Sequence, residues 1–339
     1  MSDKSNENLV LIDADSIIYV VGYELAEMPL EPIGIIKLDE FITDILIATG
    51  SRNYQGFFGG KGGHNFRKNI AITKGYKANR ADDKPEWFEF WAPILLKRME
   101  EHWGFEPCLN IEADDACAIA AEKYRGKYNK VTIASPDKDL FQIPDMWFYD
   151  YIKRTTVYVE ETVALQKLCI QIITGDSTDN IPGCFGAGAS AAKVPVDAIM
   201  KAGLGYDDAM TAVKEFYVEW HTEILRNKQG KKQEKVFLDK YKEDNGISRL
   251  TKKIKSDALK DFVVDTSMLL DKTQAIKLFK EQYQLVKLLS TEAEGKKHEF
   301  TLGEPTVDSS INWDEITIFH DDMEMMEDEQ DFDDIEEIL

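Results

Sequence analysis

The stretch GDSTDNIPGCFGAG, residues 175–188, combines two kinds of ligand site in one short segment. Two carboxylates, Asp176 and Asp179, stand just before a proline and a run of glycines. Carboxylates at short spacing hold divalent metal ions. A glycine-rich turn that opens a helix lets backbone N–H groups approach a phosphate closely. The stretch therefore predicts a metal site beside a phosphate-backbone site, which is what an enzyme cutting a nucleic-acid strand needs.

The hydrophobic pattern around this stretch alternates strands with helices. Apolar runs predict strands at residues 9–12, 56–58 and 130–135, and a hairpin at 147–151 and 155–159. Helical patterns cover residues 86–103, 113–123, 189–202, 206–226 and 273–289, with a Lys-rich link at 227–235. We therefore expect an α/β fold with a mainly parallel central sheet flanked by helices, and a helical C-terminal part. Ligand sites in such sheets lie at the carboxyl ends of strands, where Asp13 and Asp137 are found.

Charge is distributed very unevenly along the chain. The net charge of −21 argues against a nucleic-acid partner at first sight. Residues 314–339, however, hold 13 acidic residues and no Lys or Arg, which leaves 49 acids against 41 bases in residues 1–313. Residues 61–80 carry six Lys or Arg and no acid. Local charge is thus the better guide, and we expect residues 306–339 to be an acidic, disordered tail.

The remaining composition is that of an ordinary globular protein. No run of 18 apolar residues predicts a transmembrane helix, and the N-terminus lacks a signal-peptide pattern. The four cysteines, Cys108, Cys117, Cys169 and Cys184, form no C-x-x-C pair. We expect reduced thiols and no zinc site, in a cytoplasmic protein that binds no membrane.

Carboxylates gather in four groups. They are Asp13 with Asp15; Glu112 with Asp114 and Asp115; Asp137 with Asp139; and Asp176 with Asp179. A single such pair is usually solvated surface, but converging carboxylates repel one another unless a cation neutralises them. Two Mg²⁺ or Mn²⁺ ions about 4 Å apart could activate water and stabilise the leaving oxygen of a phosphodiester.

A basic segment accompanies these acids. Phe66, Arg67 and Lys68 are followed by the run YKANR at residues 76–80. Cations suit phosphates and an aromatic ring suits base stacking, so the segment fits a strand of nucleic acid. A solvated basic loop is the alternative when the segment is judged alone.

Taken in order, these motifs resemble the 5′-nuclease family: flap endonucleases, the 5′–3′ exonuclease domain of bacterial DNA polymerase I, and phage 5′–3′ exonucleases. The resemblance covers about residues 9–200, and its specific pieces are EADD at 112–115 and GDxxDNIPGxxGxG at 175–188. It implies a PIN-like core at residues 1–165 with a helical arch at about 68–103. It also implies a helix–three-turn–helix (helix-hairpin-helix) DNA-binding region within residues 166–305.

The resemblance also implies roles for individual residues. A first metal site would use Asp13, Glu112, Asp114 and Asp137, with Asp115 in the same acidic group, and a second would use Asp139, Asp176 and Asp179. Lys77 would contact the scissile phosphate with help from Arg80 and Arg67. Tyr76 would stack on a base, and nucleic-acid contacts would include Lys68, Gly183, Gly186, Gly188 and Lys193. The family's hairpin often coordinates K⁺ through carbonyls.

One position departs from the family pattern. A carboxylate is expected near the end of the second strand, where this chain has Gly59-Gly60-Lys61-Gly62. Asp15 is a possible substitute for the carboxylate missing at Gly60. The departure leaves open a 5′-end or flap DNA-binding protein with impaired catalysis.

Other readings stay open for the whole chain and its tail. The start LVLIDADS also fits haloacid-dehalogenase-type phosphatases, with Asp13 as nucleophile and Asp15 as general acid. The expected substrate is DNA with 5′ ends or flaps, and RNA–DNA primers are a further candidate. We expect a monomer. The tail, with Phe332, Ile335 and Ile338 among its acids, would solubilise the chain, bind a replication protein or compete for the basic cleft.

Overall fold

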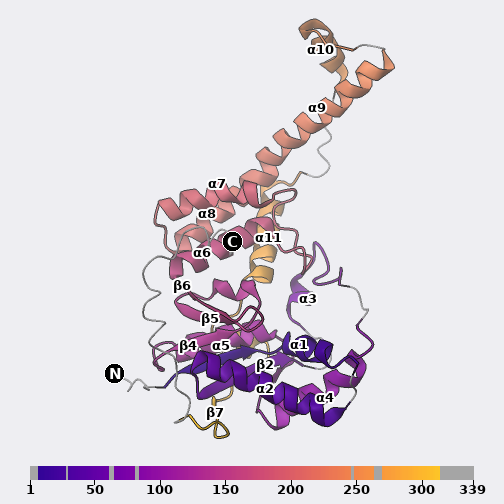
Figure 1. Cartoon of the computed structure of the whole chain (residues 1–339). Helices are drawn as coiled ribbons and strands as arrows, with labels where there is room; N and C mark the ends of the chain where they lie inside the picture. The colour runs from indigo at the N-terminus through magenta and orange to yellow at the C-terminus, as the bar shows by residue number, and fades with distance from the viewer. Residues whose placement is uncertain are drawn as a thin grey trace. The chain divides into compact units, whose positions relative to one another are not determined.

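The computed structural model describes residues 7–27, 30–60, 65–80, 84–245, 248–262 and 269–313, and Figure 1 shows its helices and strands. The chain divides into two compact units. Unit 1 is formed from residues 1–69, 80–167 and 287–339, and unit 2 from residues 70–79 and 168–286. The change of unit after residue 167 lies close to the expected boundary at 165. Residues 287–305, which we expected in the second part, belong with unit 1.

A central sheet organises unit 1 (Figure 1). Its strands are β1 (Leu9–Asp13), β2 (Asn53–Gly59), β3 (Glu106–Cys108), β4 (Val131–Ala134), β5 (Met146–Asp150), β6 (Thr155–Val159) and β7 (Thr306–Val307). The order is β3-β2-β1-β4-β5-β6, and β7 pairs with β2. The pairs β2–β1, β1–β4, β4–β5 and β2–β3 are parallel, whereas β5–β6 and β2–β7 are antiparallel. The predicted mainly parallel α/β sheet is confirmed.

Apolar residues of β1 supply two hydrophobic cores, one on each face of the sheet. Leu9 and Leu11 join the cluster formed with α5 (Ala113–Tyr124). Val10 and Ile12 join the cluster formed with α1 (Ile17–Glu24), α2 (Glu31–Thr49) and α4 (Phe88–Glu101). A strand covered on both faces needs a continuous apolar run, which is why LVLI does not alternate with polar residues. The smaller helices of unit 1 are α3 (Arg67–Ile70), the 3₁₀ helix Lys138–Gln142 and α12 (Glu292–Lys297).

Helix α4 is part of the core of unit 1. The Trp91 side chain is 1% exposed and its indole N–H donates to the Leu25 carbonyl at 3.2 Å. A Cβ atom at Gly34 would collide with the same indole ring. Helix α4 lies in the segment from residue 68 to about 103 for which we predict an arch, and its apolar face is buried against α1 and α2.

Unit 2 is helical. Its helices are the second half of α6 (Glu161–Thr174), α7 (Ala189–Lys201), α8 (Tyr206–Glu219), the π-helix Trp220–Ile224, α9 (Leu225–Asp244), α10 (Lys252–Ala258), the 3₁₀ helix Leu259–Asp261 and α11 (Lys272–Val286). The Lys-rich residues 227–235, expected as a link, are helical instead. Lys and Gln are good helix formers, and α8 continues through the π-helix directly into α9.

The beginning of the acidic tail is ordered. Strand β7 pairs with β2, and the Asp308 carboxylate accepts hydrogen bonds from Ser310 Oγ at 2.6 Å and from the Trp313 indole at 3.0 Å. The expected disorder is thus wrong for residues 306–313, and residues 314–339 lie outside the described residues. All four cysteines are buried and none is in a disulfide. Within the described ranges, no helix has the length and apolar character needed to cross a membrane.

Candidate active site

Asp13 ends β1 and lies at the carboxyl edge of the sheet. Its side chain accepts a hydrogen bond from Ser135 Oγ at 2.8 Å, and Ser135 directly follows the neighbouring strand β4. The Tyr151 hydroxyl donates to the Asp13 carbonyl at 2.9 Å. With only 6% of its surface exposed, Asp13 is held in one orientation at the point where parallel strands place their ligands.

The charge on Asp13 is poorly compensated. Burial, together with the nearby Asp15 and Asp137 carboxylates, raises the pKa of Asp13 to about 7, against the opposing hydrogen bonds from Ser135 and the Asp15 backbone. Among the described residues, no Lys or Arg forms an ion pair with Asp13. A buried carboxylate that faces other carboxylates is stabilised by a bound cation.

Asp15 places a carboxylate at the end of β2, where the sequence lacked one. Its Oδ1 accepts a hydrogen bond from the Gly59 N–H at 2.6 Å. Gly60 donates its own N–H to the Cys108 carbonyl at 2.7 Å. A Cβ atom at Gly60 would lie 2.9 Å from that carbonyl oxygen and 2.6 Å from Leu109 Cδ2. The strand end therefore leaves no room for a side chain at Gly60, and Asp15 reaches the same place from β1.

Asp137 and Asp139 open the 3₁₀ helix after β4. The Asp137 N–H donates to Ser135 Oγ at 3.0 Å, and Asp137 Oδ1 accepts from the Asp139 N–H at 2.8 Å. Asp139 also forms an ion pair with Lys167 of α6 at 3.6 Å. Lys167 was not identified from the sequence, because a lysine on an amphipathic helix carries no signal of its partner.

The acidic group before α5 separates into buried and accessible members. Asp115 is fully buried, and both of its oxygens accept from the guanidinium of Arg67, which is 1% exposed. Arg67 also bonds to Glu112 Oε2 at 3.3 Å. Leu289 N–H donates to Asp115 Oδ1 at 2.9 Å. Asp115 and Arg67 therefore neutralise each other inside unit 1, and both are shielded from solvent.

The other members of that group and of the basic segment lie nearer the surface. The Glu112 side chain is 18% exposed, and Asp114 Oδ1 accepts a hydrogen bond from the Asp115 N–H at 2.6 Å. Lys68, on α3, and Arg80 are exposed. These carboxylate and cationic groups are therefore more accessible than the buried Arg67–Asp115 pair.

In unit 2, hydrogen bonds join the basic segment around Tyr76 to the acidic turn around Asp179, about one hundred residues later in the chain. The Tyr76 hydroxyl donates to Asp179 Oδ2 at 2.8 Å, and Lys77 Nζ lies 3.5 Å from the same oxygen. The Lys77 N–H donates to the Asp179 carbonyl at 2.9 Å, and the Asn180 amide donates to the Gly75 carbonyl at 2.8 Å. Tyr76 is 6% exposed, so its ring is covered instead of open for base stacking.

The glycine-rich turn depends on conformations that other residues rarely adopt. Asp176 Oδ1 accepts hydrogen bonds from the Thr178 and Asp179 N–H groups at 2.7 and 3.3 Å. Gly175 and Gly183 have φ of +72° and +58°, and a Cβ atom on either would collide with the backbone of the other's segment.

The end of the turn leads into α7. Gly186 has φ of +68°, and Gly188 is the residue before α7. No described atom lies within 4 Å of a Cβ placed at either glycine. Lys193 is exposed on α7 and pairs with Asp197 at 3.6 Å. A helix N-terminus preceded by open glycine backbone suits a phosphate.

Side chains from α8, the π-helix and α11 hold the turn. The Tyr217 hydroxyl donates to the Gly183 carbonyl at 2.7 Å, and the Gly183 N–H donates to Gln282 Oε1 at 3.1 Å. The Trp220 indole donates to the Phe185 carbonyl at 3.0 Å. These residues were missed in the sequence, although residues 217, 220 and 221 have the spacing of one helical face.

His221 completes this support as a neutral imidazole. Its Nε2 accepts from the Phe185 N–H at 3.3 Å, so Nδ1 carries the hydrogen and donates to the Tyr217 carbonyl at 2.8 Å. Burial lowers the pKa of His221, against the opposing effect of the Tyr217 hydrogen bond. Protonation of Nε2 would break the bond to Phe185.

The donors fit a hard divalent cation by chemistry. Carboxylate oxygens are the ligands that Mg²⁺ and Mn²⁺ prefer, and Asp13 and Asp15 at the end of β1 and Asp137 after β4 follow neighbouring parallel strands at the carboxyl edge of the sheet. No group of three Asp, Glu, His or Cys side chains within the described ranges is already arranged around a metal position. The assignment therefore rests on donor type and on the uncompensated burial of Asp13.

Comparison with known proteins identifies similar sequences. Residues 8–168 match the family described as 5′-3′ exonuclease, N-terminal resolvase-like domain. DNA polymerase I of Rhizobium leguminosarum is 31% identical over 138 residues, which is 38% of this chain and 13% of that protein. A 5′-3′ exonuclease of Aquifex aeolicus is 36% identical over 90 residues, 24% of this chain and 31% of that protein. The chain spans less than a third of the length of these curated relatives.

Solved structures share the fold. The bacteriophage T5 5′-exonuclease with bound divalent metal ions (zinc) has a TM-score of 0.54 at 16% identity, covering 84% of this chain and 90% of that one. The bacteriophage T5 flap endonuclease in a pseudo-enzyme–product complex with DNA and metal ions has a TM-score of 0.51 at 15% identity, with the same coverage.

Proposed function

We propose that this chain is a 5′–3′ exonuclease and structure-specific 5′ flap endonuclease acting on DNA, and the match of residues 8–168 to the 5′-3′ exonuclease N-terminal domain family supports this proposal. The observation that carries the proposal is Asp13, a carboxylate 6% exposed whose charged neighbours are carboxylates. A bound cation would offset this charge, and metal-assisted hydrolysis of a phosphodiester is the chemistry that we propose for this arrangement. DNA replication, repair or recombination would use such an activity.

Divalent metal ions, Mg²⁺ or Mn²⁺, are the proposed cofactors, and two ions would supply an activated water and stabilise the leaving oxygen. The proposed ligands in unit 1 are Asp13, Asp15, Glu112, Asp114, Asp137 and Asp139, and those in unit 2 are Asp176 and Asp179. Asp115 is left out of this set because Arg67 already occupies both of its oxygens. Ser135 orients Asp13 by donating its hydroxyl hydrogen.

The basic and glycine-rich segments are the proposed DNA contacts. Asp179 holds Lys77 by its backbone and its ammonium, so Lys77 presents one cation in a defined place for a phosphate of the substrate. Lys68 and Arg80 add exposed positive charge. The turn from Gly183 to Gly188 and the start of α7 would hold the duplex backbone, with K⁺ at its carbonyls.

Substrate and partner choices follow from the same proposal. DNA with 5′ ends or flaps is the proposed substrate, with RNA–DNA primers as an extension of it. The acidic tail is proposed to bind a replication protein. We propose that the chain acts as a monomer in the cytoplasm of a bacterial or phage-infected cell.

Cleavage of labelled substrates tests the function directly. Duplex, nicked, flap and RNA–DNA substrates carrying a 5′ label would be incubated with Mg²⁺, Mn²⁺ or EDTA, and the products mapped. We expect metal-dependent cleavage at 5′ ends or flap junctions, and loss of cleavage in Asp179→Ala.

Two outcomes would overturn the proposal. Tight binding without cleavage in any metal would favour a binding protein with impaired catalysis. Release of phosphate from small phosphate esters, abolished by Asp15→Asn, would favour the phosphatase reading.

A further inference from the structure

The segment after the π-helix is strongly basic in an acidic chain. Residues 225–262 hold 12 Lys or Arg and six Asp or Glu, whereas the whole chain has a net charge of −21. The excess is greatest at the beginning of α9, where residues 225–235 carry five bases and one acid. An excess of positive charge concentrated in one element indicates a negatively charged partner.

Helices α9 and α10 form a defined element of unit 2. Figure 1 shows α9 running away from α7, α8 and α11, with α10 near its far end. The two helices are joined by an ion pair between Lys255 and Glu234 at 2.7 Å. Phe237 and Phe262 add a ring contact at 5.3 Å between centroids. We call this element the basic arm.

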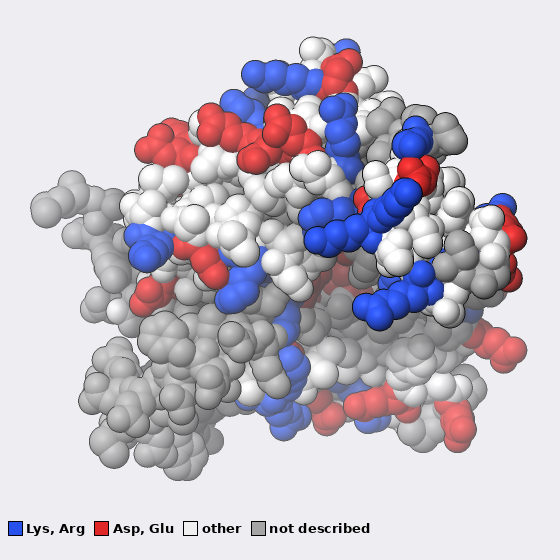
Figure 2. All heavy atoms as spheres, turned by 90° about the horizontal axis from the view of Figure 1, so that it is seen from above, with Lys and Arg blue, Asp and Glu red and all other residues white. Residues whose placement is uncertain are grey.

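Lysines line one side of the arm. Lys228, Lys231, Lys232 and Lys235 are exposed, and their spacing of three, four and seven residues puts them on one face of α9. Within the described ranges, Lys231, Lys232 and Lys235 take part in no ion pair. Figure 2, seen from above, shows blue Lys and Arg side chains gathered on the side toward which α9 extends. We call these four residues the lysine stripe.

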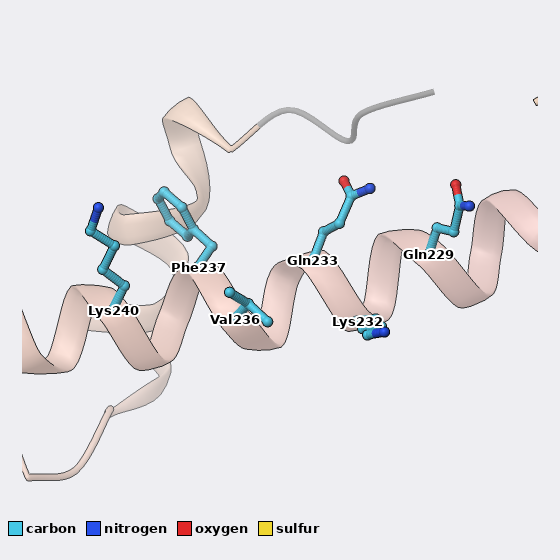
Figure 3. Close-up of a pocket in the computed structure, with 6 residues that line it drawn as sticks. All are labelled: Gln229, Lys232, Gln233, Val236, Phe237 and Lys240. Carbon is cyan, nitrogen blue, oxygen red and sulfur yellow. The ribbon is translucent and has the colours of Figure 1, made fainter. Parts of the chain in front are cut away.

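A pocket with both polar and apolar lining residues borders the stripe. A shallow pocket on α9 is lined by Gln229, Lys232, Gln233, Val236, Phe237 and Lys240 (Figure 3). In Figure 3, Phe237 points toward the side on which α10 lies, and Lys232 lies on the opposite edge of α9.

The stripe begins next to the turn that we propose to hold the duplex. Lys228 Nζ lies 4.3 Å from the centre of the Trp220 ring, and the Trp220 indole donates to the Phe185 carbonyl within that turn. The helix is continuous from α8 through the π-helix to α9, so it connects the residues that hold the turn with the lysine stripe. A DNA duplex that runs from the turn along α9 would therefore bring its phosphate backbone close to the lysine stripe.

We propose that the lysine stripe binds the phosphate backbone of duplex DNA beyond the glycine-rich turn. The inference rests on the proposed function and extends it to the length of duplex that is bound. The seven residue steps from Lys228 to Lys235 span about 10 Å along α9, which corresponds to roughly three base pairs of B-DNA. The arm thus lengthens the duplex footprint without adding base contacts, so it changes affinity and not sequence preference.

Binding to two duplex lengths tests the inference. Flap DNA with about 10 or about 24 base pairs of duplex would be titrated by fluorescence anisotropy in EDTA, from about 0.05 to 0.3 M salt. Wild type should bind the long duplex on the order of tenfold more tightly at about 0.1 M salt. Lys231→Gln/Lys235→Gln should lose most of that gain, and its salt slope should fall by about 2 on the long duplex alone.

A matched control removes the same charge elsewhere. Lys127→Gln/Lys153→Gln replaces two exposed lysines of unit 1 and should leave the length effect unchanged. Equal affinity of wild type for both lengths, or an unchanged length effect in the α9 variant, would overturn the inference and indicate another acidic occupant. Flap cleavage by wild type in the same preparation keeps this result separate from failure of the proposed function.

Discussion

Asp13 and Asp115 are both buried carboxylates of unit 1, and the protein treats them in opposite ways. Asp115 is fully buried and meets the Arg67 guanidinium with both oxygens. Asp13 meets a hydroxyl, and its charged neighbours Asp15 and Asp137 have the same sign. A buried carboxylate that is paired with a cation of the protein, such as Asp115, has a structural role. A buried carboxylate without such a partner, such as Asp13, can bind a metal ion from solution.

The largest effect is expected for Asp13→Asn. Cleavage should fall about a thousandfold, because several kcal/mol of transition-state stabilisation depend on the bound cation. The metal-free variant should nevertheless be more stable than wild type at pH 8, by about 1–3 kcal/mol, since a repelled buried charge is removed. Cleavage assays and urea unfolding in EDTA measure the two effects. Retained cleavage, or a destabilised variant, would contradict the contrast with Asp115.

Arg67→Met tests whether Asp115 depends on its pairing with the Arg67 guanidinium. Removing the guanidinium leaves Asp115 charged and buried, so the free energy of unfolding should fall by about 3–5 kcal/mol. Arg98→Met is a suitable control, because Arg98 pairs with Asp39 at 2.7 Å with both side chains about a quarter exposed. That variant should lose about 1 kcal/mol or less. If an Arg67 variant stays stable but does not cleave DNA, Arg67 contacts the scissile phosphate, as the family resemblance implies, and does not serve mainly to pair with Asp115.

The sequence could predict strands and helices that have their own local sequence pattern. The apolar run of β1, the strand before Ser135 and the alanine-rich α5 each contain their own signal, and the structure has all three. The parallel sheet follows from their alternation, so the carboxyl ends of the strands, and Asp13 with them, could be placed.

Contacts between distant residues could not be predicted. Nothing local distinguishes Asp115 from Asp114, because the difference lies in Arg67, 48 residues away. The same holds for Tyr76, whose ring looked suited to stacking until Asp179 and burial were seen. A lysine-rich stretch reads equally as a link or a helix, and only its continuation from α8 decides for α9.

His221 extends the comparison to a buried base. Its pKa is lowered by burial, so the unfolded chain takes up a proton below pH 6.5 that the folded chain resists. This contribution to stability is present at pH 7 and is lost as the pH falls, by up to about 2 kcal/mol at pH 5. His221→Gln should lack that part of the pH dependence in urea unfolding at pH 5 and 7. Parallel pH curves for the two proteins would show that folding does not lower the pKa of His221.

Tyr76→Phe should have the smallest effect and separates two roles for one ring. If the hydroxyl holds Asp179, the change removes one hydrogen bond, lowers stability by about 1 kcal/mol and reduces cleavage less than tenfold. The Lys77 N–H bond to the Asp179 carbonyl remains in the variant and limits the damage. If the ring stacks on a base instead, Tyr76→Phe should behave as wild type and Tyr76→Ala should weaken flap binding. Unfolding and flap-binding measurements on both variants therefore decide whether Asp179, like Asp115, is held by a partner from a distant motif.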